Sequence, residues 1–175
     1  AEVVDGPDEP LRAPARTGEL ERSALDPSLA AEVLGWRPGV ALDYEVIEDG
    51  LAYVVSLDPE AIFTDGSPVT AADVAGAWGF ASRPANAPPG GGAALETGKI
   101  NGMDAVIAGE ATEADGLIVL DDHTLMIELM EPDPLWPQSM AQRTLGVFKV
   151  EQAREDPEWE RRPIGVGPYT LTLDP

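Results

Sequence analysis

The stretch FTDGSPVTAADV, from Phe63 to Val74, determines the local structure around it. Asp65-Gly66 predicts a turn, because glycine adopts positive φ angles without steric cost. Pro68 then restricts the backbone directly after the turn. The stretch therefore predicts a strand, a tight turn and an extended dipeptide, followed by a helix.

The helix expected from Ala71 has start and stop signals in the sequence. Thr70 can cap its N-terminus, and Asp73, three residues on, can complete a short-armed capping box. Pro84 is expected to end the helix, because the residue before a proline avoids the helical conformation. One stripe of the helix is predicted to be buried, at positions spaced i, i+4 and i+7: Val74, Trp78 and Ala81.

Two pairs of apolar runs predict β-hairpins. Residues 44–47 and 51–57 flank Glu48-Asp49-Gly50, which is a hairpin turn signal. Residues 117–120 and 125–129 flank a second polar turn, Asp121-Asp122-His123-Thr124. Because strand side chains alternate, the first hairpin should carry one apolar face, made by Leu51, Tyr53, Val55 and Leu57.

Shorter elements are expected between and around the hairpins. The Pro-Pro-Gly-Gly-Gly run at 88–92 should be a loop, and no Gly-Lys-Ser/Thr follows it, which excludes a phosphate-binding loop. Residues 103–109 suit either a helix or a strand. Four further elements are predicted: helical turns at 29–34, a short helix that packs Leu135, Trp136 and Met140, a helix from 151 up to Pro157, and a final strand at 169–173.

The composition excludes several classes of partner. The 175 residues include 32 acidic and 11 basic side chains, for a net charge of −21. Nucleic acids and anionic membrane surfaces both require a basic footprint, so neither is an expected partner. The absence of cysteine excludes disulfides and thiol catalysis. The only lysines are Lys99 and Lys149, and this bias towards arginine suggests a GC-rich genome.

The sequence predicts no catalytic chemistry. The single histidine, His123, lies in a charged turn, while a metal site needs three or four converging ligands, so it should be exposed and bind no metal. No nucleophile-elbow motif is present, and carboxylate pairs are too common here to indicate acid–base chemistry. We therefore expect no catalytic residue, no metal site and no cofactor. The three Phe, four Trp and three Tyr residues should lie mainly in the core, and a ligand-binding protein would place one or two of them at its pocket.

Three further segments join FTDGSPVTAADV in a recognisable order. They are EVIEDGLAYVV at 45–55, GLIVLDDHTLMIELMEP at 116–132 and PIGVGPY at 163–169. In sequence and spacing the four resemble motifs of the bacterial extracellular solute-binding proteins of family 5, the peptide- and nickel-binding receptors of ABC transporters. The resemblance runs from about residue 29 to the end. It departs from the family pattern at Thr64, where Ser is common, at Val166, where Thr is common, and at Tyr44, which lies near the place of a Trp.

The resemblance implies an α/β fold of α+β character, with mixed sheets, β-hairpins and short helices, as part of a periplasmic-binding-protein-like type II fold. Full receptors of this family are much longer and have two lobes that close on the ligand. By this comparison, residues 1–112 correspond to the small extra domain of the first lobe and residues 113–175 to part of its main domain. The chain is thus expected to be a fragment of a larger receptor.

The function implied by the resemblance is binding without catalysis. The chain would belong to an extracellular substrate-binding lipoprotein, at the cell surface or in the periplasm, that serves an ABC importer of oligopeptides or related small solutes. It would bind solute only with the missing lobe present, contact an ABC permease in the full protein, and reach the membrane only through a lipid anchor preceding Ala1. No ligand-binding residue is assigned by the four motifs. The alternative is a non-transport lipoprotein of the same fold that regulates cell-envelope glycolipid synthesis.

Overall fold

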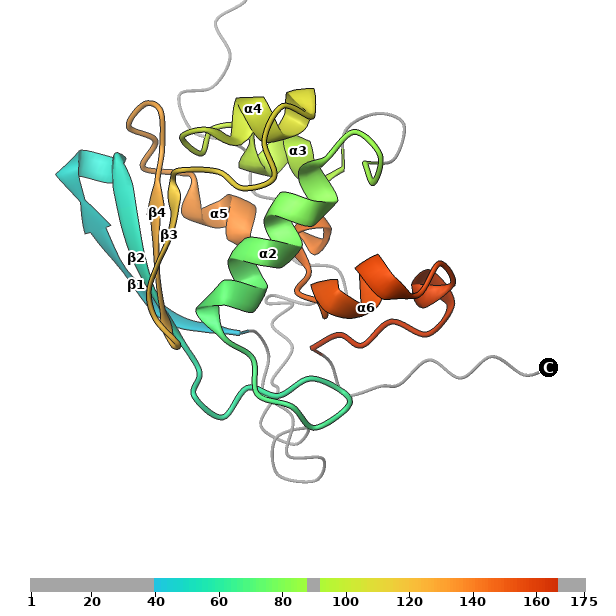
Figure 1. Ribbon diagram of the computed structural model, residues 1–175. Coiled ribbons are helices and arrows are strands. Elements are labelled where there is room, and N and C mark those ends of the chain that lie inside the picture. The colour runs from blue at the N-terminus through green and yellow to red at the C-terminus, as the bar shows by residue number, and fades with distance from the viewer. Residues whose placement is uncertain (1–39, 88–91, 167–175) are drawn as a thin grey trace, which may run out of the picture.

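The computed structural model describes residues 40–87 and 92–166, and the elements predicted at 29–34, 88–91 and 169–173 lie outside these ranges. Two hairpins and several short helices make up the described chain (Figure 1). The strands and helices are β1 (Ala41–Ile47), β2 (Ala52–Leu57), α2 (Ala71–Ser82), α3 (Ala93–Thr97), α4 (Met103–Ala108), β3 (Leu117–Asp121), β4 (Thr124–Glu128), α5 (Pro137–Met140) and α6 (Val150–Glu155). Three short 3-10 turns are η1 (Glu48–Gly50), η2 (Arg143–Leu145) and η3 (Trp159–Arg161).

Both predicted hairpins are confirmed, and they combine into one sheet. The strand order is β1-β2-β4-β3, and every neighbouring pair is antiparallel. At the centre, Tyr53 pairs with Ile127 and Val55 pairs with Leu125, which aligns the apolar faces of the two hairpins. The division predicted at residues 112 and 113 stays a prediction, and the sheet spans it. The α/β fold of α+β character, with hairpins and short helices, is as expected.

The capping box at the start of α2 is also confirmed. Thr70 Oγ1 accepts a hydrogen bond from the backbone N–H of Asp73 at 3.3 Å, and the Asp73 carboxylate accepts one from the backbone N–H of Thr70 at 2.8 Å. The helix ends at Ser82, two residues before Pro84. Local residue chemistry therefore sets both ends of the longest helix.

Replacing Thr70 by alanine should lower the free energy of unfolding by about 1 kcal/mol, because the substitution leaves a helix-terminal N–H without its partner. Urea denaturation of the two proteins measures the difference. Thr144→Ala is the matched control, since Thr144 is exposed and makes no side-chain hydrogen bond in the described part of the chain. Equal midpoints for Thr70→Ala and Thr144→Ala would contradict a stabilising cap.

The main core lies between the sheet and α2, which crosses one face of it (Figure 1). Tyr53, Trp78 and Trp136 form its aromatic centre, and the Trp136 ring lies 5.7 Å from that of Tyr53 and 6.3 Å from that of Trp78. Val74 is buried as predicted, while Ala81 is only partly buried. The expectation that Leu135 packs inward is wrong, since 67% of it is exposed. Trp136, which was also expected to pack, is buried in the turn before α5.

A second, smaller core attaches α6 to α2, on the side away from the sheet (Figure 1). Phe80 of α2 contacts Phe148 and Trp159 edge-on, and these two rings stack at a centroid distance of 4.9 Å. Residues 103–109, which suited either type of element, form helix α4 followed by Gly109. Within the described ranges, no helix is both long and apolar enough to cross a bilayer.

Candidate functional site

The turn in FTDGSPVTAADV is tight and internally bonded. The Phe63 N–H donates to the Ser67 carbonyl at 2.8 Å, and Gly66 takes a φ of 84°, which only glycine adopts readily. The Asp65 carboxylate accepts hydrogen bonds from the Ser67 N–H at 2.9 Å and from the Ser67 hydroxyl at 2.6 Å. These bonds hold the Asp65 side chain in one orientation.

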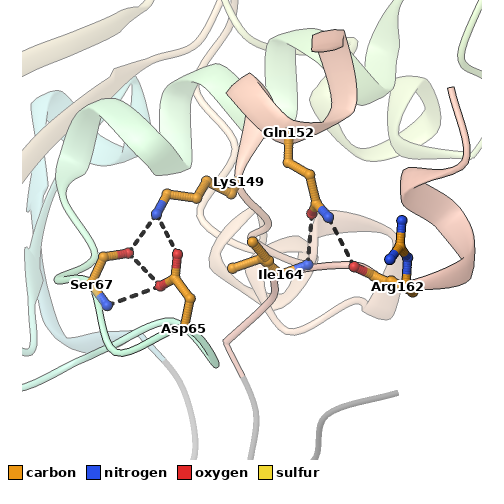
Figure 2. A network of polar contacts seen from close by, with 6 residues as sticks. All are labelled: Asp65, Ser67, Lys149, Gln152, Arg162 and Ile164. Atoms are coloured by element: carbon orange, nitrogen blue, oxygen red, sulfur yellow. Dashed lines mark hydrogen bonds and ion pairs between the residues drawn. The ribbon is translucent and has the colours of Figure 1, made fainter. Parts of the chain in front are cut away.

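Lys149 binds this turn from a distant part of the chain (Figure 2). Its ammonium group lies 2.5 Å from the Asp65 carboxylate and 2.8 Å from the Ser67 hydroxyl, and 5.7 Å from the centre of the Phe63 ring. The hydrogen bond from Lys149, aided by those from Ser67, holds the pKa of Asp65 well below its usual range. We call Asp65, Ser67 and Lys149 the lysine clasp.

A third segment lies against the clasp. The Thr64 N–H donates to the Gly165 carbonyl at 3.0 Å, and the Lys149 N–H donates to the Ile164 carbonyl at 2.9 Å. Gln152 fixes the same segment, because its amide accepts from the Ile164 N–H and donates to the Arg162 carbonyl, both at 2.9 Å (Figure 2). The clasp therefore joins the FTDGSP turn to the described part of the PIGVGPY motif.

The four motifs form one continuous set of contacts. The N–H of Ala71, which begins α2, donates to the Asp122 carbonyl in the β3–β4 turn at 2.8 Å. The next residue of that turn, His123, accepts a hydrogen bond through its carbonyl from the Leu57 N–H at 2.8 Å. Since β4 also pairs with β2, the hairpin motifs, the signature turn and the final motif are all linked. The residues of these motifs mainly build a scaffold.

His123 is partly buried, so the expectation that it is exposed is wrong. Its N–H donates to the Asp121 carboxylate at 2.8 Å, and its carbonyl accepts from the Leu57 N–H at the end of β2. The N–H of His123 is the main reason that the pKa of Asp121 is lowered. Among the described residues no group of three or more His, Cys, Asp or Glu side chains could hold a metal ion.

An apolar cleft of about 410 Å³ opens between the sheet and the segment from α5 to η2. Val55 and Leu57 of β2 and Trp78 of α2 line it, and the Trp78 N–H is already bonded to the Leu145 carbonyl at 3.0 Å. The cleft thus offers apolar surface and few free polar groups. Such a surface suits packing better than the recognition of a charged ligand.

Sequence reasoning missed Lys149 as a member of this site. The available signal was weak: Lys149 and Lys99 are the only two lysines, and each bonds an aspartate far away in sequence, Lys99 to Asp133 and Lys149 to Asp65. Most of the aromatic side chains that the structure describes lie in the two cores, as expected, while Tyr44 is 47% exposed at the sheet edge.

Replacing Lys149 by methionine should make the stability of the chain depend less on pH in acid. Because the folded pKa of Asp65 lies below its unfolded value, this carboxylate stabilises the fold above about pH 4, and the stabilisation is lost as the pH falls through the folded pKa. Without Lys149, the pKa of Asp65 in the folded chain rises towards its ordinary value. The slope of the unfolding free energy against pH therefore becomes shallower.

Urea denaturation at a series of acidic pH values measures this slope. Arg143→Met removes an exposed positive charge that forms no ion pair in the described part of the chain, so it should leave the slope unchanged. Equal slopes for Lys149→Met and the wild-type chain would show that the clasp is too weak to hold Asp65 ionised.

All four motifs lie within the region that is matched by a model of a known protein family. The family model for bacterial extracellular solute-binding proteins, family 5 Middle, matches residues 35–173. The periplasmic murein peptide-binding protein MppA of Escherichia coli is 33% identical over 139 residues, which cover 77% of this chain and 25% of that protein. The periplasmic oligopeptide-binding protein OppA of Salmonella typhimurium is 35% identical over 117 residues, covering 66% of this chain and 21% of that protein.

A solved structure shows the same fold. The unliganded open form of MppA superimposes with a TM-score of 0.69 at 29% identity, covering 79% of this chain and 27% of that one. The chain spans about a fifth to a quarter of the length of the curated relatives described above. Because the family match extends over most of the sequence, this chain belongs to the bacterial extracellular solute-binding proteins of family 5.

Proposed function

We propose that this chain is a scaffold portion of an extracellular receptor that delivers oligopeptides or related small solutes to an ABC importer. The observation that carries the proposal is the set of contacts linking all four family motifs, in which the lysine clasp joins the signature turn to the last motif. The names of the relatives, an oligopeptide-binding and a murein peptide-binding protein, support peptides as the class of ligand.

Peptide binding, in this proposal, requires parts of the receptor beyond these residues. The cleft between the sheet and the segment from α5 to η2 is mainly apolar, whereas a peptide carries charged ends and a polar backbone. A receptor gains affinity by enclosing its ligand, and one open face cannot offset the several kcal/mol of entropy lost on association. The chain therefore acts as a support for the binding site, together with a second lobe.

The receptor is not an enzyme in this proposal. A discordant similarity is to a UDP-glucose 4-epimerase of Mycolicibacterium smegmatis, 57% identical over 42 residues, which cover 24% of this chain and 13% of the enzyme. A match of that length is shorter than a typical domain. We further propose that the full receptor is a lipoprotein anchored at the cell surface, and that its partner is an ABC permease.

A library of tripeptides to pentapeptides tests the proposal on two proteins, the 175-residue chain and the complete gene product that contains it. We expect micromolar or tighter binding by the complete product and none by the chain alone. Binding of that strength by the chain alone would place the peptide site within these residues and contradict the scaffold role.

Mass spectrometry of ligands that co-purify with the complete product tests the class of ligand. Recovered peptides would support import. Recovery of glycolipid precursors in place of peptides would overturn import and favour the alternative, a lipoprotein of the same fold that regulates cell-envelope glycolipid synthesis. The neighbouring genes give an independent test, because importers of this kind need permease and ATPase subunits.

A further inference from the structure

A hollow of about 220 Å³ lies along α2, between the start of β3 and helix α6. Figure 1 shows α2 lying between these two elements. Its floor is made of small residues of α2, and the apolar side chains of Leu117 and Val119 form one wall. Three charged side chains also line it: Arg83, Glu113 and Arg154.

The two arginines have N–H donors that no described residue accepts from. Arg83 donates one N–H to the Thr112 carbonyl at 2.8 Å and lies 5.8 Å from the Phe80 ring, which fixes its guanidinium. Its Nε is the one buried side-chain polar atom without a partner among the described residues. Arg154 is exposed and makes no ion pair within those residues. Four other basic residues each pair with a carboxylate: Lys99, Lys149, Arg161 and Arg162.

Unpaired arginines are unexpected in this chain. Its 32 acidic residues outnumber its 11 basic ones, so an arginine meets a carboxylate more readily than another arginine. Glu113 lines the same hollow, yet it forms no ion pair with Arg83 or Arg154. The hollow therefore presents positive and negative groups separately, next to an apolar wall.

We propose that this hollow binds a small zwitterion, an α-amino acid with an aliphatic side chain. The guanidinium groups of Arg83 and Arg154 receive its carboxylate, since arginine donates parallel N–H groups that match a carboxylate. Glu113 receives the ammonium group, and Leu117 and Val119 contact the side chain. The volume is below that of a typical drug-sized pocket, so it suits a single amino acid rather than a longer peptide. The site does not depend on the receptor function proposed above.

The test is an NMR titration of the ¹⁵N-labelled 175-residue chain with three ligands of one shape. L-leucine carries both charges, 4-methylpentanoate lacks the ammonium group, and 3-methylbutylamine lacks the carboxylate. We expect saturable shifts of the amides of residues 112–119 with leucine, binding about tenfold weaker with 4-methylpentanoate, and no binding of the amine.

Two substitutions separate the roles of the charges. Arg154→Gln should weaken leucine and 4-methylpentanoate alike by about tenfold, and Glu113→Gln should remove the preference for leucine over 4-methylpentanoate. Arg143→Gln is the matched control, because Arg143 is also exposed and unpaired within the described residues but lies outside the hollow. It should leave all three titrations unchanged.

Three results would overturn the proposal. The first is no saturable shift at residues 112–119 with leucine. The second is equal weakening by Arg154→Gln and Arg143→Gln, which would reveal a response to net charge. The third is binding of inorganic sulfate as tightly as leucine, which would identify a general anion site. Far-ultraviolet circular dichroism confirms that each variant is folded before it is titrated.

Discussion

Trp136→Ala should lower the free energy of unfolding by about 3–5 kcal/mol, the largest effect that we expect from a single core residue. Trp136 is 1% exposed, and its ring lies against Tyr53 and Trp78 at the centre of the main core. Its N–H also donates to the Glu96 carbonyl at 3.2 Å. Alanine would leave a cavity between the sheet, α2 and α3, and the Glu96 carbonyl would lose its donor.

Leu135→Ala is the matched control for this substitution. Leu135 is the adjacent residue and 67% of it is exposed, so its loss should change the unfolding free energy by no more than about 0.5 kcal/mol. Trp136→Phe keeps an aromatic ring and removes the hydrogen bond. Its effect on the unfolding free energy should therefore lie between those of Trp136→Ala and Leu135→Ala. Urea denaturation measures all three, and equal effects of Trp136→Ala and Leu135→Ala would show that the turn before α5 packs differently.

Gly116→Ala should cost about 3 kcal/mol, because the added methyl group has no space. A Cβ atom at Gly116 would lie 2.5 Å from the Glu128 carbonyl oxygen and 2.9 Å from the Asn101 backbone nitrogen. The backbone cannot easily move away, since the Gly116 N–H donates to the Asn101 carbonyl at 2.8 Å and its carbonyl accepts from the Glu128 N–H at 2.8 Å. Either those bonds break or the start of β3 shifts.

Gly76→Ala is the control, and it should change the unfolding free energy in the opposite direction. Gly76 lies inside α2, where the nearest atom to an added Cβ is a Val150 methyl group at 3.7 Å, which is ordinary contact. Alanine is the better helix former, so this change should raise the unfolding free energy by about 0.5–1 kcal/mol. Destabilisation by both substitutions, to the same extent, would contradict the close backbone approach at Gly116.

The elements that the sequence predicted are those set by neighbouring residues. Thr70 and Asp73 are three residues apart, and each hairpin is set by its own turn and its own alternation. The docking of β2 against β4 was not predicted, because alternation fixes which face is apolar but not which strand lies next to it.

The direction of a side chain was harder to predict where no local sequence pattern determines it. Leu135 and Trp136 are neighbours of similar hydrophobicity, and only the turn before α5 determines which of them points inward. The lysine clasp joins Asp65 to a residue 84 positions away, so no local pattern marks it. The hollow at Arg83 and Arg154 depends on the packing of α6 against α2, and no sequence motif indicates this packing.

The central pairing of β2 with β4 has a consequence for how this chain folds. Each hairpin closes a short loop and can form within about 1–10 μs, whereas joining Ser56 to Thr124 closes a loop that includes α2, α3 and α4. We therefore expect the meeting of the two hairpins to be slower than the formation of either one. The ladder between β2 and β4 is flanked by β1 and β3, so we expect its amide hydrogens to exchange with solvent after those of the outer strands.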